Sequence, residues 1–70
     1  MSDFSTRLRK LRAQKNITQK RAAEGIGLSE RLYQSYELAE KEPSLGNIIK
    51  LADFFDVSAD YLLGRSEKQK

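Results

Sequence analysis

The stretch that most constrains this chain runs from Gln19 to Glu37 and reads QKRAAEGIGLSERLYQSYE. It predicts two short helices joined by a tight turn at Gly27, because a glycine backbone tolerates the positive φ that such a turn requires. Thr18 precedes the first helix and Ser29 precedes the second, and each hydroxyl can accept a backbone N–H two or three residues on. Ala23 on the inner face of the first helix is small enough to let the second helix pack closely.

The spacing of these residues is typical of a helix-turn-helix motif, whose second helix enters the DNA major groove. A Gln is followed by an Ala four residues later, a Gly four residues after that, and a capping Ser two further on. A plain αα-corner in a small bundle has similar spacing, so the motif alone leaves both interpretations open. The charge distribution favours a polyanionic partner: residues 1–31 carry eight Lys and Arg against three acidic residues, whereas residues 32–64 carry two against six.

The composition excludes several classes of protein. At 70 residues the chain is long enough for one domain. It has neither Cys nor His, which removes disulfides, the common metal ligands and most general bases, so we expect no enzyme, metal or cofactor. No apolar run approaches the roughly 20 residues that cross a membrane, and the N-terminus lacks the apolar segment of a signal peptide. We expect a cytoplasmic protein with no membrane partner and no small-molecule ligand.

The rest of the chain predicts three more helices and no strand. Pro43 prevents residues 38–43 from continuing the preceding helix, and Gly64 is a natural helix end. We therefore expect an all-α domain of five helices over residues 1–64, followed by a polar, disordered tail at residues 65–70. The three further helices are expected at residues 4–15, 45–55 and 59–63, with caps at Ser2 or Asp3, Ser44 and Ser58.

The run from Phe4 to Gly64 resembles the Cro/CI-like family of helix-turn-helix regulators, also called the XRE type. The resemblance depends on the order and spacing of Thr-Gln, Gly-Leu-Ser, Tyr-Glu, Pro-Ser-Leu, Leu-Ala-Asp, Val-Ser and Asp-Tyr-Leu-Leu-Gly. It implies a five-helix, lambda-repressor-like domain in which the second and third helices form the DNA-binding motif. It also implies a transcriptional regulator that binds an inverted-repeat DNA operator as a homodimer and represses by occupying it.

The resemblance implies two groups of DNA contacts. Arg31 is the main candidate for base readout, because Arg can form two hydrogen bonds to guanine O6 and N7, and Gln34 can read adenine. The remaining candidates for base readout are Glu30, Leu32 and Ser35, of which Leu32 either contacts a thymine methyl group or is partly buried. The candidates for contacts with the DNA backbone are Gln19, Lys20, Arg21, Ser29, Lys41 and Asn47.

The resemblance also implies a structural pair between Arg12 and Glu37, since a planar guanidinium matches a carboxylate with two hydrogen bonds. The alternative is two unrelated surface charges. Leu62 and Leu63 are candidates for a dimer surface, because so small a core should leave one of them partly exposed. The alternative there is that both leucines belong to the core.

Two departures from the family keep a second function open. The loop LAEKEP places Glu40 and Glu42 on either side of Lys41, where relatives often have Gly and basic residues. This loop and Leu32 support an alternative, a protein-interaction module of the antitoxin or anti-repressor kind that has the same fold and little DNA binding. Gly25 is a third departure, because a glycine inside a helix weakens it by up to about 1 kcal/mol relative to Ala.

Overall fold

The computed structural model describes residues 3–70, which form five α-helices and no strand, as predicted. No helix within these residues is long and apolar enough to cross a membrane. Ser2, one of the two predicted caps of the first helix, lies outside the described residues, and Asp3 is that helix's first residue. The helices are α1 (Asp3–Lys15), α2 (Gln19–Ile26), α3 (Glu30–Glu37), α4 (Leu45–Phe55) and α5 (Ala59–Leu62).

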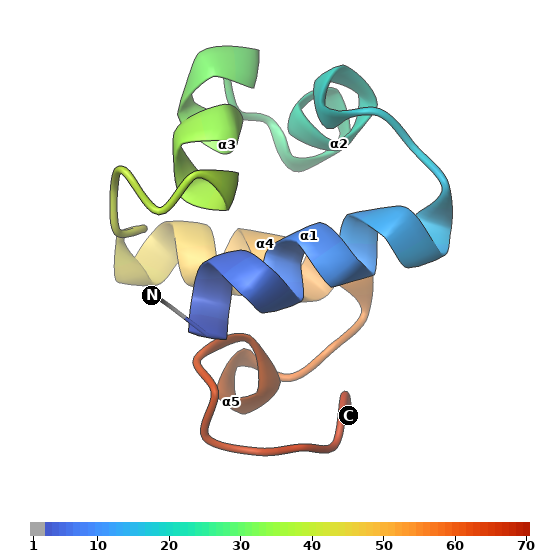
Figure 1. Cartoon of the computed structure of the whole chain (residues 1–70), viewed down its shortest axis with the longest axis vertical. Helices are drawn as coiled ribbons and strands as arrows, with labels where there is room; N and C mark the ends of the chain where they lie inside the picture. The colour runs from blue at the N-terminus through green and yellow to red at the C-terminus, as the bar shows by residue number, and fades with distance from the viewer. Residues whose placement is uncertain (1–2) are drawn as a thin grey trace.

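The five helices are arranged so that the predicted motif lies at one end of the molecule. Figure 1 shows α2 and α3 together at that end, α1 and α4 across the middle, and α5 at the opposite end. Helix α3 packs against both α2 and α1, while α5 packs against α1 and α4. Within residues 3–70, no helix covers the outer side of α3, where Glu30 and Arg31 are exposed.

Hydroxyl side chains begin four of the helices, as predicted. Each accepts the backbone N–H three residues further on, at 3.0 to 3.1 Å. Gly27 joins α2 to α3 with a φ of 90°, and its N–H donates to the Ala23 carbonyl at 2.9 Å, so the predicted turn is confirmed. The four capping residues are Thr18, Ser29, Ser44 and Ser58.

The core is a single cluster of apolar side chains to which all five helices contribute. The stripe predicted for α1, made of Phe4, Leu8 and Leu11, is buried and faces this cluster. The other buried apolar residues are Ala22, Ala23, Ile26, Tyr33, Tyr36, Ile48, Leu51, Ala52, Phe55, Tyr61 and Leu62.

The two leucines predicted as a dimer surface differ in exposure. Leu62 is fully buried, so its assignment to an exposed surface is wrong: α5 packs on α1 and α4 with this side chain in the core. Leu63 caps the C-terminal end of α5 and is 48 % exposed. Of this pair, only Leu63 has the surface needed to contact a second protomer.

Residues 65–70, for which the sequence predicts a polar, disordered tail, run beside α5 and α1 in the structure (Figure 1). The Arg7 guanidinium donates to the carbonyls of Tyr61 at 2.7 Å and Ser66 at 2.5 Å, and lies 4.4 Å from the centre of the Tyr61 ring. The Ser58 N–H donates to the Gln69 carbonyl at 2.6 Å. The sequence does not predict these contacts, because the acceptors are backbone carbonyls 54 and 59 residues from Arg7, and no side chain marks them as partners. The domain boundary at residue 64 stays a prediction.

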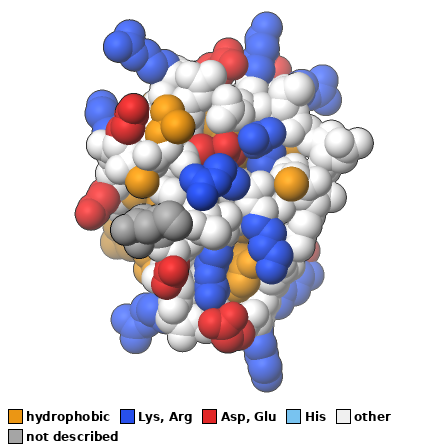
Figure 2. All heavy atoms as spheres, viewed as in Figure 1, with side chains coloured by type: hydrophobic (Ala, Val, Ile, Leu, Met, Phe, Trp, Pro, Cys, Tyr) orange, Lys and Arg blue, Asp and Glu red, His pale blue; other side chains and the backbone are white. Residues whose placement is uncertain are grey.

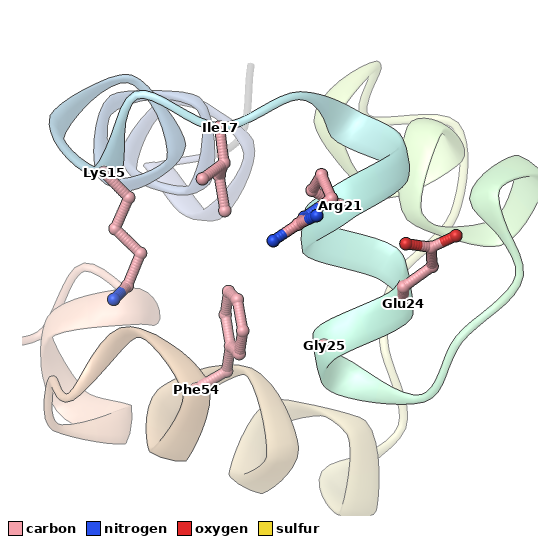
Figure 3. A pocket seen from close by; sticks show the side chains of 6 residues that line it. All are labelled: Lys15, Ile17, Arg21, Glu24, Gly25 and Phe54. Carbon is pink, nitrogen blue, oxygen red and sulfur yellow. The ribbon is translucent and has the colours of Figure 1, made fainter.

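Gly25 has a packing role that its helix propensity does not reveal. A Cβ atom at this position would lie 2.3 Å from Cε1 of Phe54, so the ring of α4 packs directly on the backbone of α2. Figure 3 shows the Phe54 ring rising from α4 toward α2. The glycine therefore permits a close approach of two helices at the cost of weakening one of them.

Replacing Gly25 with Ala is expected to lower the free energy of unfolding, despite a gain of about 1 kcal/mol in helix propensity. In a Phe54→Ala background, where the ring is absent, the same substitution is expected to raise it by up to about 1 kcal/mol. Urea denaturation of the four proteins measures this reversal of sign. A Cβ atom at Gly46 would meet only the Ser44 hydroxyl, at 4.0 Å, so Gly46→Ala is the control and should stabilise in both backgrounds.

Ala39 is strained at the C-terminal end of α3. Its φ is 61°, in the left-handed region that favours glycine. The Ala39 N–H donates to the Tyr36 carbonyl at 3.3 Å and the Glu40 N–H to the Ser35 carbonyl at 2.9 Å, which is the hydrogen-bond pattern of a Schellman motif. The residue after the cap of this motif is usually Gly, so the alanine costs stability here.

Replacing Ala39 with Gly is expected to raise the free energy of unfolding by about 0.5–1 kcal/mol, because it removes the left-handed strain. Ala13→Gly, at an exposed position inside α1, is the matched control and should lower the free energy of unfolding by about 1 kcal/mol. Urea denaturation of both variants separates the two effects. A destabilising Ala39→Gly would contradict the assigned strain.

Candidate nucleic-acid interface

The solvent-facing side of α3 carries three of the predicted base-reading side chains. Burial of Tyr33 and Tyr36 on the other side of the helix orients it this way. Glu30 and Arg31 are exposed, and Gln34 is half-buried with its amide nitrogen 3.4 Å from Glu30 Oε2. The side therefore offers both hydrogen-bond donors and acceptors to a partner, which is what reading the edges of base pairs requires.

Ser35 and Leu32 are less accessible than the other candidates. Ser35 is 8 % exposed, so the expectation that it is an exposed reader is wrong: its hydroxyl donates to the Leu32 carbonyl at 2.6 Å. A serine inside a helix commonly satisfies its hydroxyl on the preceding turn in this way. Leu32 is half-buried and packs on the edge of the core, which agrees with the alternative of partial burial.

An open groove of about 490 Å³ runs along α3 and the loop that follows it. It brings the base-reading candidates Arg31 and Gln34 together with the backbone candidate Lys41. It also contains Leu38, which is 64 % exposed and which sequence analysis missed. Leu38 could have been identified from its position, because it is the first residue after α3 and extends the surface of that helix. The remaining lining residues are Ser29, Leu32, Ser35 and Glu40.

Neither of the basic side chains in the first turn of α2 lines the groove along α3. Lys20 and Arg21 are both exposed. Arg21 lines a different hollow, of about 440 Å³, between the end of α1, α2 and α4. Figure 3 shows its side chain pointing toward this hollow, which Lys15 and Phe54 also line. The structure therefore separates Arg21 from the groove along α3.

Two further backbone candidates have their side-chain amides bound within the protein. Gln19 Nε2 donates to Glu37 Oε1 at 3.0 Å, and Asn47 Nδ2 donates to the Tyr36 hydroxyl at 2.8 Å. Both residues are half-buried. Each links a neighbouring helix to α3, Gln19 from α2 and Asn47 from α4, and so supports the orientation of α3.

Arg12 and Glu37 form an ion pair with two hydrogen bonds between α1 and the end of α3. Arg12 Nε donates to Glu37 Oε2 at 2.6 Å and Arg12 Nη2 to Oε1 at 3.1 Å. The Glu37 side chain is 2 % exposed and that of Arg12 is 26 % exposed. Burial acts to raise the pKa of Glu37, but the donors around it, Arg12 above all, outweigh burial and hold that pKa below its ordinary value. The hydrogen bond to Glu37 raises the pKa of Arg12.

Two more α1 side chains hold the end of α3, and sequence analysis missed both. The Ser5 hydroxyl donates to the Tyr36 carbonyl at 2.6 Å, and Arg9 Nη1 donates to the Glu37 carbonyl. These carbonyls belong to the last turn of α3, whose partial negative charge favours a cation. Ser5, Arg9 and Arg12 follow helical spacing and form a polar stripe beside the apolar stripe of α1, which is the signal that could have found them.

Charged side chains are mixed over the molecule. Figure 2 shows Lys and Arg side chains projecting at both ends of this view, with acidic side chains among them. The chain carries a net charge of +3. On this face acidic side chains lie among the basic ones.

Comparison with known proteins identifies the fold. A helix-turn-helix family model matches residues 8–62. The chain is 39% identical over 67 residues to the uncharacterized HTH-type transcriptional regulator YqaE of Bacillus subtilis (strain 168), covering 96% of this chain and 58% of that protein. It is 44% identical over 64 residues to the HTH-type transcriptional regulator AnsR of the same organism, covering 91% of this chain and 54% of AnsR. The chain spans a little over half the length of these relatives.

A solved structure has the same arrangement of helices. The P22 c2 repressor protein, crystallised in complex with the synthetic operator 9T, matches with a TM-score of 0.84 and 28% sequence identity, over 90% of this chain and 96% of that one. The predicted lambda-repressor-like fold is thereby confirmed. The chain belongs to the helix-turn-helix family, as a member of its Cro/CI-like (XRE) type.

Proposed function

We propose that this domain binds a specific sequence of double-stranded DNA and regulates transcription, as a dimeric cytoplasmic repressor that occupies an inverted-repeat operator. The observation that carries this proposal is the solvent-facing side of α3, whose polar side chains border an open groove while its buried side is held by α1. The likeness to a repressor bound to its operator supports the same function.

The proposed mechanism assigns different chemistry to the two helices of the motif. Arg31 enters the major groove and donates two hydrogen bonds to a guanine, while the apolar surfaces of Leu32 and Leu38 can contact thymine methyl groups. Lys20 and the N-terminal end of α2 contact phosphates, because free N–H groups and the helix dipole favour an anion there. Phosphate contacts then position the domain and base contacts specify the sequence.

We infer that the protomers of the dimer meet near Leu63, at the end of α5. Its side chain is 48 % exposed. Helix α5 lies at the opposite end of the molecule from α2 and α3 (Figure 1), so contacts along α5 leave α3 of each protomer free. A two-fold arrangement of this kind matches an operator with inverted half-sites about one helical turn apart. Apolar surface exposed at one end of a small domain is a common site of association.

The test is selection of bound sequences from a randomised DNA pool at moderate salt, with Arg31→Ala as a matched control. Enrichment of an inverted repeat by the wild type supports the proposal, and loss of one enriched base position in the variant assigns that base to Arg31. The second candidate is a protein-interaction module, favoured by the exposed Leu38 next to Glu40 in the groove. Weak, salt-sensitive binding without enrichment would overturn the DNA-reading proposal in favour of this module.

A further inference from the structure

The hollow between the end of α1, α2 and α4 is a surface that the proposed base contacts leave unused. Its volume is about 440 Å³, and it shares no lining residue with the groove along α3. In Figure 1 the C-terminal ends of α1 and α4 lie at the right of the view, whereas α3 lies at the left. A partner bound in this hollow would therefore leave the groove along α3 open.

The floor of the hollow is an aromatic ring that is held in place from below. A Cβ atom at Gly25 would lie 2.3 Å from Cε1 of Phe54, and the Phe55 ring packs edge-on against Phe54 with 4.9 Å between the ring centres. Phe54 is nevertheless only half-buried, and so is Ile17, whose side chain points toward the ring (Figure 3). The hollow therefore offers a fixed apolar floor that solvent can reach.

Two cations flank this floor. Lys15 Nζ is 5.5 Å from the centre of the Phe54 ring, and Arg21 points into the hollow from the other side (Figure 3). No carboxylate within residues 3–70 lies at ion-pair distance from either cation. The acidic residue of the lining, Glu24, is exposed, and Figure 3 shows its carboxylate turned away from the ring. Positive charge beside the floor is thus left without a partner.

We propose that this hollow docks an acidic segment of a second protein. An aromatic side chain of the segment packs on Phe54 and Ile17, and a neighbouring carboxylate binds Lys15 and Arg21. The apolar floor favours such a segment over a DNA phosphate, which has no apolar part to cover it. The open shape favours it over a small molecule, because sites for small molecules enclose most of the ligand, whereas four of the six lining residues here are exposed.

The first test is selection from a library of random peptides displayed on phage, with the purified domain as bait. The selection is done at low salt because salt screens exposed charges. We expect enrichment of peptides with an acidic residue next to an aromatic one. Lys15→Glu is expected to weaken binding of the enriched peptide about tenfold, since it replaces an attraction by a repulsion. Lys10→Glu is the matched control, because Lys10 is equally exposed on α1 but does not line the hollow.

The second test is a change of opposite sign at the edge of the hollow. Glu24→Gln removes the carboxylate that repels an acidic peptide, so it is expected to strengthen binding about twofold. Fluorescence anisotropy of the labelled peptide measures both variants and the control. Loss of folding cannot explain a gain in one variant and a loss in the other, and thermal melts of the same proteins check this directly.

The outcomes separate this inference from the proposed function. No enrichment of acidic and aromatic peptides, or equal affinity of wild type and Lys15→Glu for the enriched peptide, overturns the docking site. A reduced salt slope of operator binding in Lys15→Glu, but not in Lys10→Glu, would assign the hollow to a DNA phosphate and overturn it as well. A wild type that selects no DNA sequence overturns the proposed function alone, because peptide binding is measured without DNA.

Discussion

Replacing Glu37 with Ala is expected to lower the free energy of unfolding by about 3 kcal/mol. Glu37 is 2 % exposed and accepts two hydrogen bonds from Arg12 and one from Gln19. Removing the carboxylate takes away the anion that neutralises Arg12, whose Nη1 keeps its hydrogen bond to the Ile17 carbonyl at 3.1 Å. The cost lies at the lower end of the range for buried pairs because the Arg12 side chain is still 26 % exposed and can reach water. A domain of this size has a total stability of about 4–10 kcal/mol, so the loss is a large part of it.

Urea denaturation at neutral pH measures this effect, with Glu40→Ala at an exposed position as the matched control. The control is expected to change stability by no more than about 0.5 kcal/mol. The folded-state pKa of Glu37 is lowered, so its contribution is present above its unfolded pKa of about 4.3 and is lost as pH falls through the folded value. Stability of the wild type should therefore fall more steeply in acid than that of Glu37→Ala. Parallel acid profiles, or a change below about 1 kcal/mol at neutral pH, would contradict this role.

Replacing Arg31 with Ala is expected to weaken binding to the selected operator by about 1–3 kcal/mol and to relax the preference at one base position. Arg31 is exposed on α3 and lines the groove, so its guanidinium is free to reach the edge of a guanine. The substitution does not touch the core, and the free energy of unfolding should change little. Titration of the operator and of a set of single-base variants measures both the loss and its dependence on the base.

Lys20→Ala is the matched comparison for Arg31→Ala, because it removes one exposed positive charge from the other helix of the motif. It is expected to weaken binding to every sequence and to reduce the slope of log K against log salt by about one unit. A uniform loss across all base variants after Arg31→Ala would show that Arg31 contacts phosphate and does not read a base.

Positions of the five helices could be predicted from the sequence because each depends on residues within a few positions of one another. The hydroxyl of Ser29 caps α3 through the N–H of Leu32, and Gly27 supplies the left-handed turn, so both signals are local. The pair of Arg12 and Glu37 came from the family resemblance. Its two residues are 25 positions apart, and no local pattern joins them.

Only the tertiary structure shows which side chains are exposed to solvent and which are bound within the protein. Arg9 and Ser5 look like surface residues in the sequence, yet they bind carbonyls of α3, because a carbonyl acceptor is present at every residue and identifies no partner. Ser35 and Leu62 also differ from expectation, since burial depends on which helix covers a face and not on the residue itself. The sequence by itself determined the helices, their caps and the family, because these depend on local geometry. The fold decided that Arg12 and Gln19 both bind Glu37, because such contacts arise only when α1, α2 and α3 pack together.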